Sequence, residues 1–473
     1  MIIWNYFWNR ERVYSWACTL QGYLHSAGAL LSRPRPEVAI VASGRTLPLV
    51  RRILQRSALR VRVLADGALA QFAGFALGRP SRIGLIFVPP GPASAVIPER
   101  DLQRLAAAFD AAVARAGVNG LAQLVQSETG PWLRSQLSKA FDWEALAFRY
   151  LEAMKARLLV VLQDFQGQQR ALALAARQLG IRCLTQQHGA VGFYPHFVSP
   201  ISDYVSVWSQ KWAPWFTEDL GVEPARIRVL TEPLYEQHVP ANGSQPDPSW
   251  RRQHGIPPDH KLVLYAFQPN PPVSAFSHPA ASELAALEAC AALGRLPKVW
   301  TVLKMHPGWP DEVGQQIARY SGAKALTVLV RADNFRLLQN VDVVLTRTST
   351  LAFEAALLGV PVVALDLPPI GIKPGRNPFV TGDFTLVAAT AQEAASLTER
   401  LLFDAEFRSS VCAHQQRNLP AYFDRKSDVV DWLRDVLDNS PQATWQTSPP
   451  RQACPPSERG GARIQKEACD TRA

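Results

Sequence analysis

The 473-residue chain contains no apolar stretch of the roughly 18 residues that a membrane-spanning helix requires. Its longest apolar runs have the length of a strand or of a core helix. The aromatic, basic beginning of the chain does not resemble a secretory signal, because no clean apolar run follows the charges and no small-residue cleavage pattern appears. Neither a spanning helix nor a secreted product is therefore expected.

The chain also lacks the usual patterns of metal and disulfide chemistry. Its six cysteines show neither CxxC spacing nor a cysteine–histidine cluster with zinc-site spacing. No acidic pair of the DxD type follows a suitable predicted strand, so we expect metal-independent chemistry and no cofactor. A reducing cytoplasm is the simplest compartment for such cysteines.

Charge and composition narrow the choice of partners. The formal net charge is +10, with 47% hydrophobic and 19% charged residues, which are values of a globular protein. A positive net charge of this size is usual for a solvated surface. Alternatively, it serves to bind anionic partners such as nucleotides, polyanionic acceptors or membrane surfaces. Nucleic acid is not expected, because no basic stripe interleaved with aromatics and no nucleic-acid motif is present.

Continuous apolar strands alternate with helices in two successive parts of the chain. In the first part we expect strands at residues 38–42, 61–64, 83–88, 158–162 and 181–185. In the second part we expect them at residues 262–267, 299–304, 326–330, 343–346 and 362–365. Strands that are apolar throughout form parallel sheets with both faces covered. The pattern predicts an α/β protein with two Rossmann-like domains that face a central cleft.

Composition divides the chain into five segments. They are an aromatic, basic segment at 1–36, an N-terminal domain at 37–240, a linker rich in Pro, Gly and Asn at 241–260, a C-terminal domain at 261–438, and a polar, Pro-rich tail at 439–473 that we expect to be disordered. The first segment is either a helix packed on the protein or a stretch that lies on a membrane interface, at the inner face of the membrane.

The most informative segment is Asp342–Asp366, a strand, a loop, a helix and a strand. The loop Arg347–Thr350 supplies hydroxyls and an arginine where a helix opens, and the first N–H groups of that helix lack internal partners. Such a place binds anions, although Ser349 or Thr350 could simply cap the helix. Glu354 lies one turn further, where its carboxylate could accept hydrogen bonds from a ribose.

Three other loops follow predicted strands, where open α/β sheets bind their ligands. Lys304 and His306 can donate to a phosphate. His188, beside Gly189, has a side chain suited to proton transfer near neutral pH, or it is a buried structural histidine. Asp164 could be a general base at the edge of the cleft, or the N-cap of a helix expected to start at Phe165.

These loops together resemble the GT-B superfamily of glycosyltransferases, and more narrowly the bacterial capsule and surface polysaccharide transferases for Kdo or sialic acid and the CDP-glycerol glycerophosphotransferases. The resemblance is carried by Gln187–Gly189, Ser202–Trp208, Gly221–Ile227, His306–Pro307, Ser349–Thr350 with Glu354–Ala355, and Gly359–Val362. It is good over residues 158–366 and poor over residues 37–157.

The chain departs from this family pattern in two places. Glu232 stands where the family's "v-t-G-x-P" segment has glycine, and the loop Gln268–Pro272 has no glycine that would let backbone approach a diphosphate. UDP-N-acetylglucosamine 2-epimerases share the fold, but their D-S-G-G motif with two following glutamates reads Thr348–Leu351 with one glutamate here, which favours a transferase.

The resemblance implies a transferase that moves a group from a nucleotide-sugar or CDP-glycerol donor to a polysaccharide or lipid-linked acceptor. It places His306, Lys304, Ser349 and Thr350 on the donor phosphate and Glu354 on the ribose. His188 and Asp164 are the candidate catalytic bases. A 2-epimerase, or a GT-B shell that binds nucleotide sugars without catalysis, remains the alternative.

Overall fold

The computed structural model describes most of the two predicted domains. The described residues are 36–41, 46–65, 83–87, 104, 143–162, 164, 167–187, 189, 199–236, 247–267, 287–305, 314–315, 319, 325–330, 332–366, 377–423 and 426–439. The expectations for His188, for His306, for residues 1–35 and for the tail after residue 439 lie outside this part of the chain.

The N-terminal sheet has seven strands, all parallel, in the order β3-β2-β1-β4-β5-β6-β7. Its strands are β1 (Val38–Val41), β2 (Val61–Ala65), β3 (Ile83–Phe87), β4 (Leu158–Val161), β5 (Arg182–Gln186), β6 (Tyr204–Val207) and β7 (Ile227–Val229).

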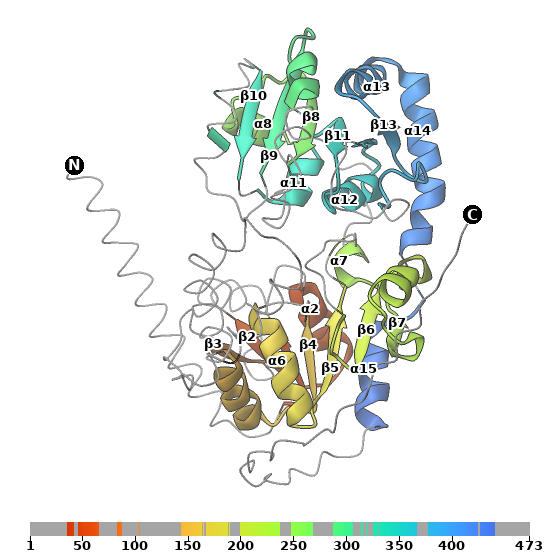
Figure 1. The fold of residues 1–473 in the computed structure, drawn as a ribbon. Coiled ribbons are helices and arrows are strands. Elements are labelled where there is room, and N and C mark those ends of the chain that lie inside the picture. The colour runs from red at the N-terminus through yellow and green to blue at the C-terminus, as the bar shows by residue number, and fades with distance from the viewer. Residues whose placement is uncertain are drawn as a thin grey trace, which may run out of the picture.

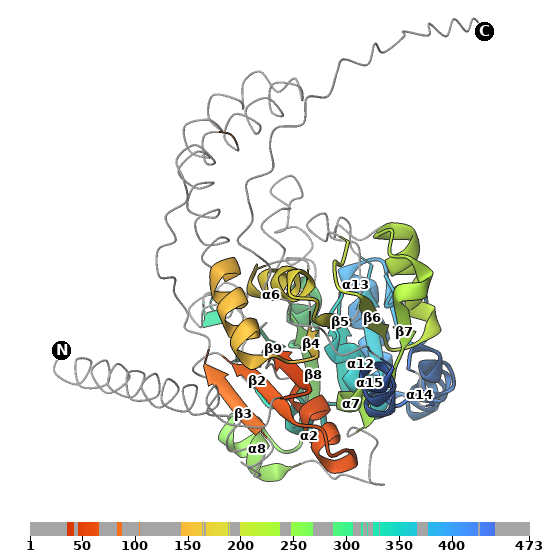
Figure 2. The same ribbon diagram turned by 90° about the horizontal axis from the view of Figure 1, so that it is seen from below.

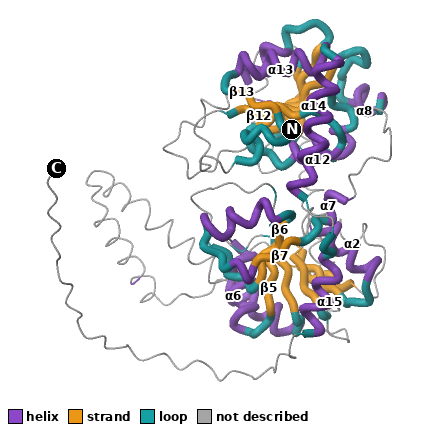
Figure 3. The backbone as a smooth tube through the Cα atoms, turned by 90° about the vertical axis from the view of Figure 1, so that its right-hand side faces the viewer, coloured by secondary structure: helices purple, strands orange, loops and turns teal. Residues whose placement is uncertain are grey.

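The C-terminal sheet has six parallel strands in the order β10-β9-β8-β11-β12-β13. Its strands are β8 (Lys261–Ala266), β9 (Val299–Lys304), β10 (Leu326–Leu329), β11 (Val343–Thr346), β12 (Val362–Leu365) and β13 (Leu386–Ala388). Two parallel sheets with flanking helices confirm the predicted α/β architecture, and Figures 1 and 3 show them in two separate domains, one above the other.

Helices cover both faces of the N-terminal sheet. Helix α6 (Gly167–Gln178) packs on one face through its alanines, whereas α2 (Thr46–Arg56) and α15 (Val429–Asp438) pack on the other (Figure 2). Helix α15 corrects the expectation that residues 261–438 all belong to the C-terminal domain. Its apolar stripe, which includes Val430 and Leu433, is buried against the strands of the first sheet.

Helices pack on the β11, β12 and β13 side of the C-terminal sheet. They are α12 (Leu351–Leu357), α13 (Ala391–Phe403), α14 (Ala405–Asn418) and the short α11 (Asn334–Leu338). Helix α14 runs from this sheet toward the N-terminal domain and leads into α15 (Figure 1). The chain therefore crosses between its domains a second time.

The linker expected at 241–260 is partly folded. Helix α8 (Pro248–Gln253) lies inside it, capped by Asp247, whose carboxylate accepts from the backbone N–H groups of Ser249 and Trp250. Trp250 is buried in the same core as Leu262. The polar composition concealed this helix because only its tryptophan and an arginine are buried.

Aromatic side chains join the two domains. We call them the aromatic junction: Trp208, Trp212, Tyr235, Phe353, Phe379, Phe384, Tyr422 and Phe423. They come from the loop after β6, from α7 (Pro233–Glu236), from α12, from the segment before β13 and from the segment after α14. All of them belong to one continuous core. Within the described residues, no helix is long and apolar enough to cross a membrane.

Candidate functional site

The strand order of the C-terminal sheet reverses between β8 and β11. Successive strands run outward from β8 through β9 to β10, and then from β11 through β12 to β13. At such a switch point the loops diverge and leave a crevice outside the carboxyl ends of the strands, where ligands bind. The register places Lys304, Ala266 and Thr346 at the same level on that edge. The predicted phosphate loops therefore flank the switch point.

The loop between β11 and α12 is shaped by its own hydroxyls. The backbone N–H of Ser349 donates to Oγ1 of Thr346 at 2.9 Å, and Oγ of Ser349 accepts from the N–H of Leu351 at 3.3 Å. Thr350 precedes the helix but its side chain makes no capping hydrogen bond. Arg347 is only 2% exposed and brings a guanidinium to the base of this loop. Ser349 thus has the capping role, while Thr350 does not.

Lys304 and Glu354 are brought together across the switch point, one from the end of β9 and one from the first turn of α12. Burial lowers the pKa of Lys304, and the Glu354 carboxylate partly opposes this shift. Glu354 is 4% exposed and its Oε2 accepts from Nδ2 of Asn334 at 2.9 Å. Asn334 begins α11 beside the same edge, and nothing in the sequence pattern had singled it out.

The two domains meet at a glycine. Gly189 follows β5 with φ +81°, and a Cβ built on it would lie 2.6 Å from Oγ1 of Thr350. A residue other than glycine would therefore be both strained and in collision with Thr350, in the loop between β11 and α12. The loop is fixed by Gln187, whose Nε2 donates to the carbonyl of Gly189 at 2.9 Å and whose Oε1 accepts from the N–H of Trp208. The carboxyl edges of the two sheets consequently face each other.

Asp164 lies after β4 but is turned away from helix α6. The described part of that helix begins at Gly167, and Phe165, its expected first residue, lies outside the described residues. Within the described residues, no N–H group of the helix donates to the Asp164 side chain. Its Oδ2 accepts from the backbone N–H of Ile201 and from the N–H and Oγ of Ser202, at 2.6–2.8 Å. Asp164 is fully buried. This geometry holds the chain at the entry to β6.

Glu232, the residue that departs from the glycine of the family pattern, has a definite partner. Nε2 of Gln186 donates to its Oε2 at 2.7 Å, and both side chains are 4% exposed. Gln186 ends β5, and Glu232 precedes α7, which lies between the two domains in Figure 1. The departure therefore adds a buried carboxylate to the carboxyl edge of the N-terminal sheet.

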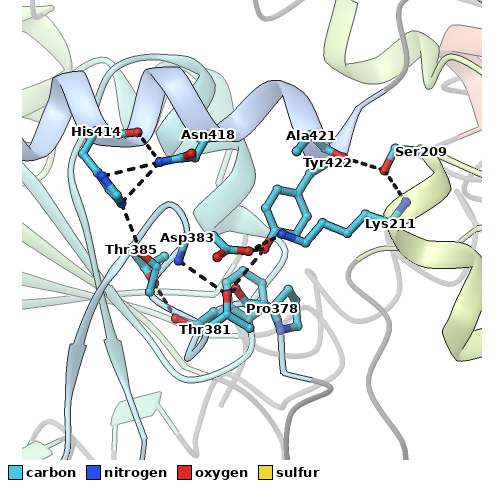
Figure 4. A network of polar contacts seen from close by, with 12 residues as sticks. Ser209, Lys211, Pro378, Thr381, Asp383, Thr385, His414, Asn418, Ala421 and Tyr422 are labelled. Atoms are coloured by element: carbon cyan, nitrogen blue, oxygen red, sulfur yellow. Dashed lines mark hydrogen bonds and ion pairs between the residues drawn. The ribbon is translucent and has the colours of Figure 1, made fainter.

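A polar network ties the domains together beside the aromatic junction (Figure 4). Nζ of Lys211 pairs with Oδ2 of Asp383, which also accepts from the Tyr422 hydroxyl at 2.7 Å, and the same Nζ lies 4.2 Å from the centre of the Tyr422 ring. Oγ of Ser209 donates to the carbonyl of Ala421, and Nε1 of Trp212 donates to that of Tyr422. Three chain segments thus converge on one joint.

No family model and no curated protein sequence matches the chain. Several solved structures align with it in three dimensions. MnaA of S. aureus, solved with UDP, aligns at 12% identity with a TM-score of 0.54, over 86% of this chain and 96% of that one. HepE of Anabaena, solved with UDP-glucose, aligns at 16% identity with a TM-score of 0.52, over 85% and 98%. The UDP-GlcNAc 2-epimerase of Methanocaldococcus jannaschii aligns at 13% identity with a TM-score of 0.50, over 85% and 99%.

The fold is GT-B. Identities this low establish the arrangement of the two Rossmann-like domains and not the reaction. The GT-B fold accounts for the opposed carboxyl edges and for the second crossing through α14 and α15.

Proposed function

We propose that this GT-B protein is a glycosyltransferase that uses a nucleotide-activated sugar as donor, without a metal ion, and a polysaccharide or glycolipid hydroxyl as acceptor. The observation that carries the proposal is the meeting of Gly189 with Thr350 over the switch point. It brings the turn after β5 against the hydroxyl loop after β11, and this contact supports a site that both domains share. A transferase needs such proximity because both substrates must react within one enclosed space.

The donor side has the chemistry to stabilise a departing nucleotide. Lys304 is a half-buried cationic side chain at the edge of the crevice. Ser349 and Thr350 bring two hydroxyls to the N-terminal end of α12, where the helix dipole is positive. Together with His306, these groups are assigned to the donor diphosphate. Glu354, held by Asn334, is assigned to the ribose. UDP is the first nucleotide to test, because similar structures were solved with UDP and UDP-glucose, and CDP-glycerol is the alternative donor.

During transfer, the bond between the anomeric carbon and the phosphate oxygen breaks and its electron pair passes to the departing nucleotide. The acceptor oxygen forms the new bond and loses its proton to a base. His188, beside the Gly189 turn, is assigned as that base. Asp164 is assigned to positioning instead, because Oδ2 already holds Ile201 and Ser202 and the side chain is fully buried.

A 2-epimerase is the second candidate, because the similar structures with TM-scores of 0.50 or more include a UDP-GlcNAc 2-epimerase. The two reactions give different products. An epimerase isomerises UDP-GlcNAc and releases UDP together with 2-acetamidoglucal as an intermediate, whereas a transferase releases UDP only with transfer or hydrolysis of the sugar.

The decisive experiment follows UDP release and sugar products from UDP-GlcNAc and UDP-glucose, with wild type and the variant His306→Ala. We expect UDP and free or transferred sugar, with turnover strongly reduced in His306→Ala. Formation of UDP-ManNAc or 2-acetamidoglucal would support the epimerase. Nucleotide binding without any turnover would support a non-catalytic shell, and full turnover by His306→Ala would contradict the assigned phosphate contact.

A further inference from the structure

Gln186 and Glu232 form a buried polar pair that the proposed mechanism does not use. The Gln186 amide ends β5, and the Glu232 carboxylate reaches it from the other side of β6. Each side chain is 4% exposed. A carboxylate in this position has replaced the glycine of the family pattern, so the pair is a feature of this chain and not of the resemblance.

The carboxylate determines how the amide is oriented. An ionised carboxylate can only accept hydrogen bonds, so Gln186 must present its NH₂ group to Glu232 and turn its carbonyl oxygen elsewhere. That oxygen, Oε1, is buried and has no hydrogen-bond partner among the described residues. A buried acceptor without a donor costs about 1–3 kcal/mol, and native proteins rarely tolerate one without a reason.

The position of Gln186 distinguishes it from two other buried glutamines, Gln187 and Gln415. Gln187 has both ends of its amide bonded, to Gly189 and to Trp208. Gln415 also has an unmatched Oε1, but it lies on α14 and donates to the carbonyl of Val360, at the opposite, amino end of β12. Only Gln186, of these three, combines the unmatched oxygen with the carboxyl edge of a sheet.

Gln186 lies at the edge of the N-terminal sheet from which the Gly189 turn leaves. Gln186 is three residues before Gly189, which meets Thr350, and Glu232 stands at the start of α7 between the domains. A molecule that brings a hydroxyl to this edge would satisfy Oε1 with an O–H donor. A sugar or glycerol unit does so, since each of its hydroxyls can donate.

We propose that Gln186 binds a hydroxyl of the acceptor through Oε1 and that Glu232 is the positioning residue that keeps this oxygen directed at it. The acceptor is a polyol, such as a sugar or glycerol unit of a glycan or glycolipid. This inference rests on the proposed function and specifies its acceptor subsite. It requires Glu232 to be ionised, because a protonated carboxyl could present a donor and release the amide orientation.

The test compares Gln186→Met and Glu232→Gln with wild type, and uses Gln415→Met as the matched control. The probes are UDP-GlcNAc and UDP-glucose as donors, with octyl β-glucoside as the hydroxyl acceptor and with water alone. Glu232→Gln preserves the size of the side chain and can still hydrogen-bond to Gln186. It no longer determines whether the NH₂ group or the oxygen of the Gln186 amide is bonded to residue 232. UDP affinity is measured by calorimetry on each variant, and folding by thermal unfolding.

We expect kcat/KM for octyl β-glucoside to fall at least tenfold in Gln186→Met and in Glu232→Gln, with UDP affinity within twofold of wild type. Gln415→Met should lower the melting temperature without this kinetic effect. If wild type turns over only with water, the same comparison is made on hydrolysis, in which a water takes the acceptor position.

Unchanged acceptor kinetics in both variants would overturn the inference, and would mean that only a structural water meets the Gln186 oxygen. A loss of UDP affinity parallel to the kinetic loss would also overturn it, because the pair would then serve the donor. Failure of wild type to bind UDP or to release it from either donor would instead overturn the proposed function.

Discussion

Gly189 allows a close contact between the two domains because glycine has no side chain. Its positive φ and its contact with Thr350 are separate demands, and glycine meets both. The variant Gly189→Ala should lose about 1–2 kcal/mol of unfolding free energy from the backbone alone, with a further loss from the collision with Oγ1 of Thr350. Urea unfolding of the purified variant measures the sum.

The double variant Gly189→Ala, Thr350→Ala separates the two effects. Removing Oγ1 leaves the Thr350 Cβ as the nearest atom, at 3.7 Å, which is an ordinary contact. Gly189→Ala should therefore be less destabilising in the Thr350→Ala background than in wild type. Strictly additive losses would mean that the two loops do not touch in solution.

Lys304 makes nucleotide binding depend on pH. Burial places the pKa of Lys304 below its ordinary value of 10.5. A diphosphate binds the protonated ammonium and raises that pKa again, so the dissociation constant should be flat at neutral pH. The dissociation constant should then increase, which means weaker binding, as the pH rises through the lowered pKa of Lys304 in the free protein, before pH 10.5 is reached. Calorimetric titration of UDP between pH 7 and pH 10 measures this limb.

The variant Lys304→Met should bind UDP roughly tenfold or more weakly at pH 7, as expected for a lost charged hydrogen bond of about 1.5–3 kcal/mol. It should also lose the alkaline limb. Lys261→Met is the control, because Lys261 lies at the opposite end of β8 and is 46% exposed. An alkaline limb that persists in Lys304→Met would assign it to another group.

At the level of elements, the sequence predicts strand limits correctly where the strand is deeply buried. Strands 299–304, 343–346 and 362–365 have the predicted limits, because each is bounded by turn residues and filled with apolar side chains. Helix α14 was not predicted, since only Val411 and Gln415 of its residues are buried and no apolar stripe is visible.

The packing partner of α15 could not be predicted from the sequence. The helix has a clear apolar stripe, but the surface that it covers, on α2 and β1, lies more than 370 residues away along the chain. Asp428 caps the helix and accepts a hydrogen bond from Nε of Arg52 at 2.9 Å. This long-range pairing depends on where the chain returns, which local periodicity does not encode.

Leu433→Ala tests whether α15 is part of the N-terminal core. Leu433 is fully buried, so its truncation should cost about 2–5 kcal/mol and lower the melting temperature of the protein. Phe403→Ala is the control, since Phe403 at the end of α13 is 55% exposed and its loss should stay within about 0.5 kcal/mol. Equal effects of the two variants would contradict the packing of α15.

For the whole molecule, the joint of Lys211, Asp383 and Tyr422 links parts that could otherwise separate. Burial alone would raise the pKa of Asp383, but hydrogen bonds from Lys211 and Tyr422 and the charge of Lys211 hold it below its ordinary value. The contribution of Asp383 is therefore complete above its unfolded-state pKa of about 3.9, and it is lost as the pH falls through the lower folded-state pKa.

A double-mutant cycle with Lys211→Met and Asp383→Asn measures this joint. Both side chains are more than one third exposed, so solvent screening should keep their coupling energy within about 1 kcal/mol, and 1 M salt should reduce it further. A coupling of zero at low salt would mean that the Lys211–Asp383 pair contributes nothing to holding the domains together. The unfolding free energy of each variant in the cycle is measured by urea unfolding at pH 7.

The sequence was enough to predict two sets of parallel strands and the strand, loop, helix and strand of residues 342–366, because these follow from the alternation of apolar strands with helices. It was not enough to find Asn334 beside Glu354, or Gln186 beside Glu232. Each of these pairs joins different β-α units, and only the strand order brings the partners together. The two crossings between domains likewise depend on tertiary packing.

The central claim is that a nucleotide diphosphate binds where the loop after β11 meets the end of β9. A thermal-shift screen of wild type and of Ser349→Ala, Thr350→Val against CMP, CDP, UDP and GDP tests it most directly. We predict that one nucleotide, with UDP first, stabilises wild type by about 2.7 kcal/mol at a hundredfold excess over its dissociation constant. The same excess should stabilise the double variant much less. Stabilisation by none of the four, or by the same amount in the double variant, would contradict the account.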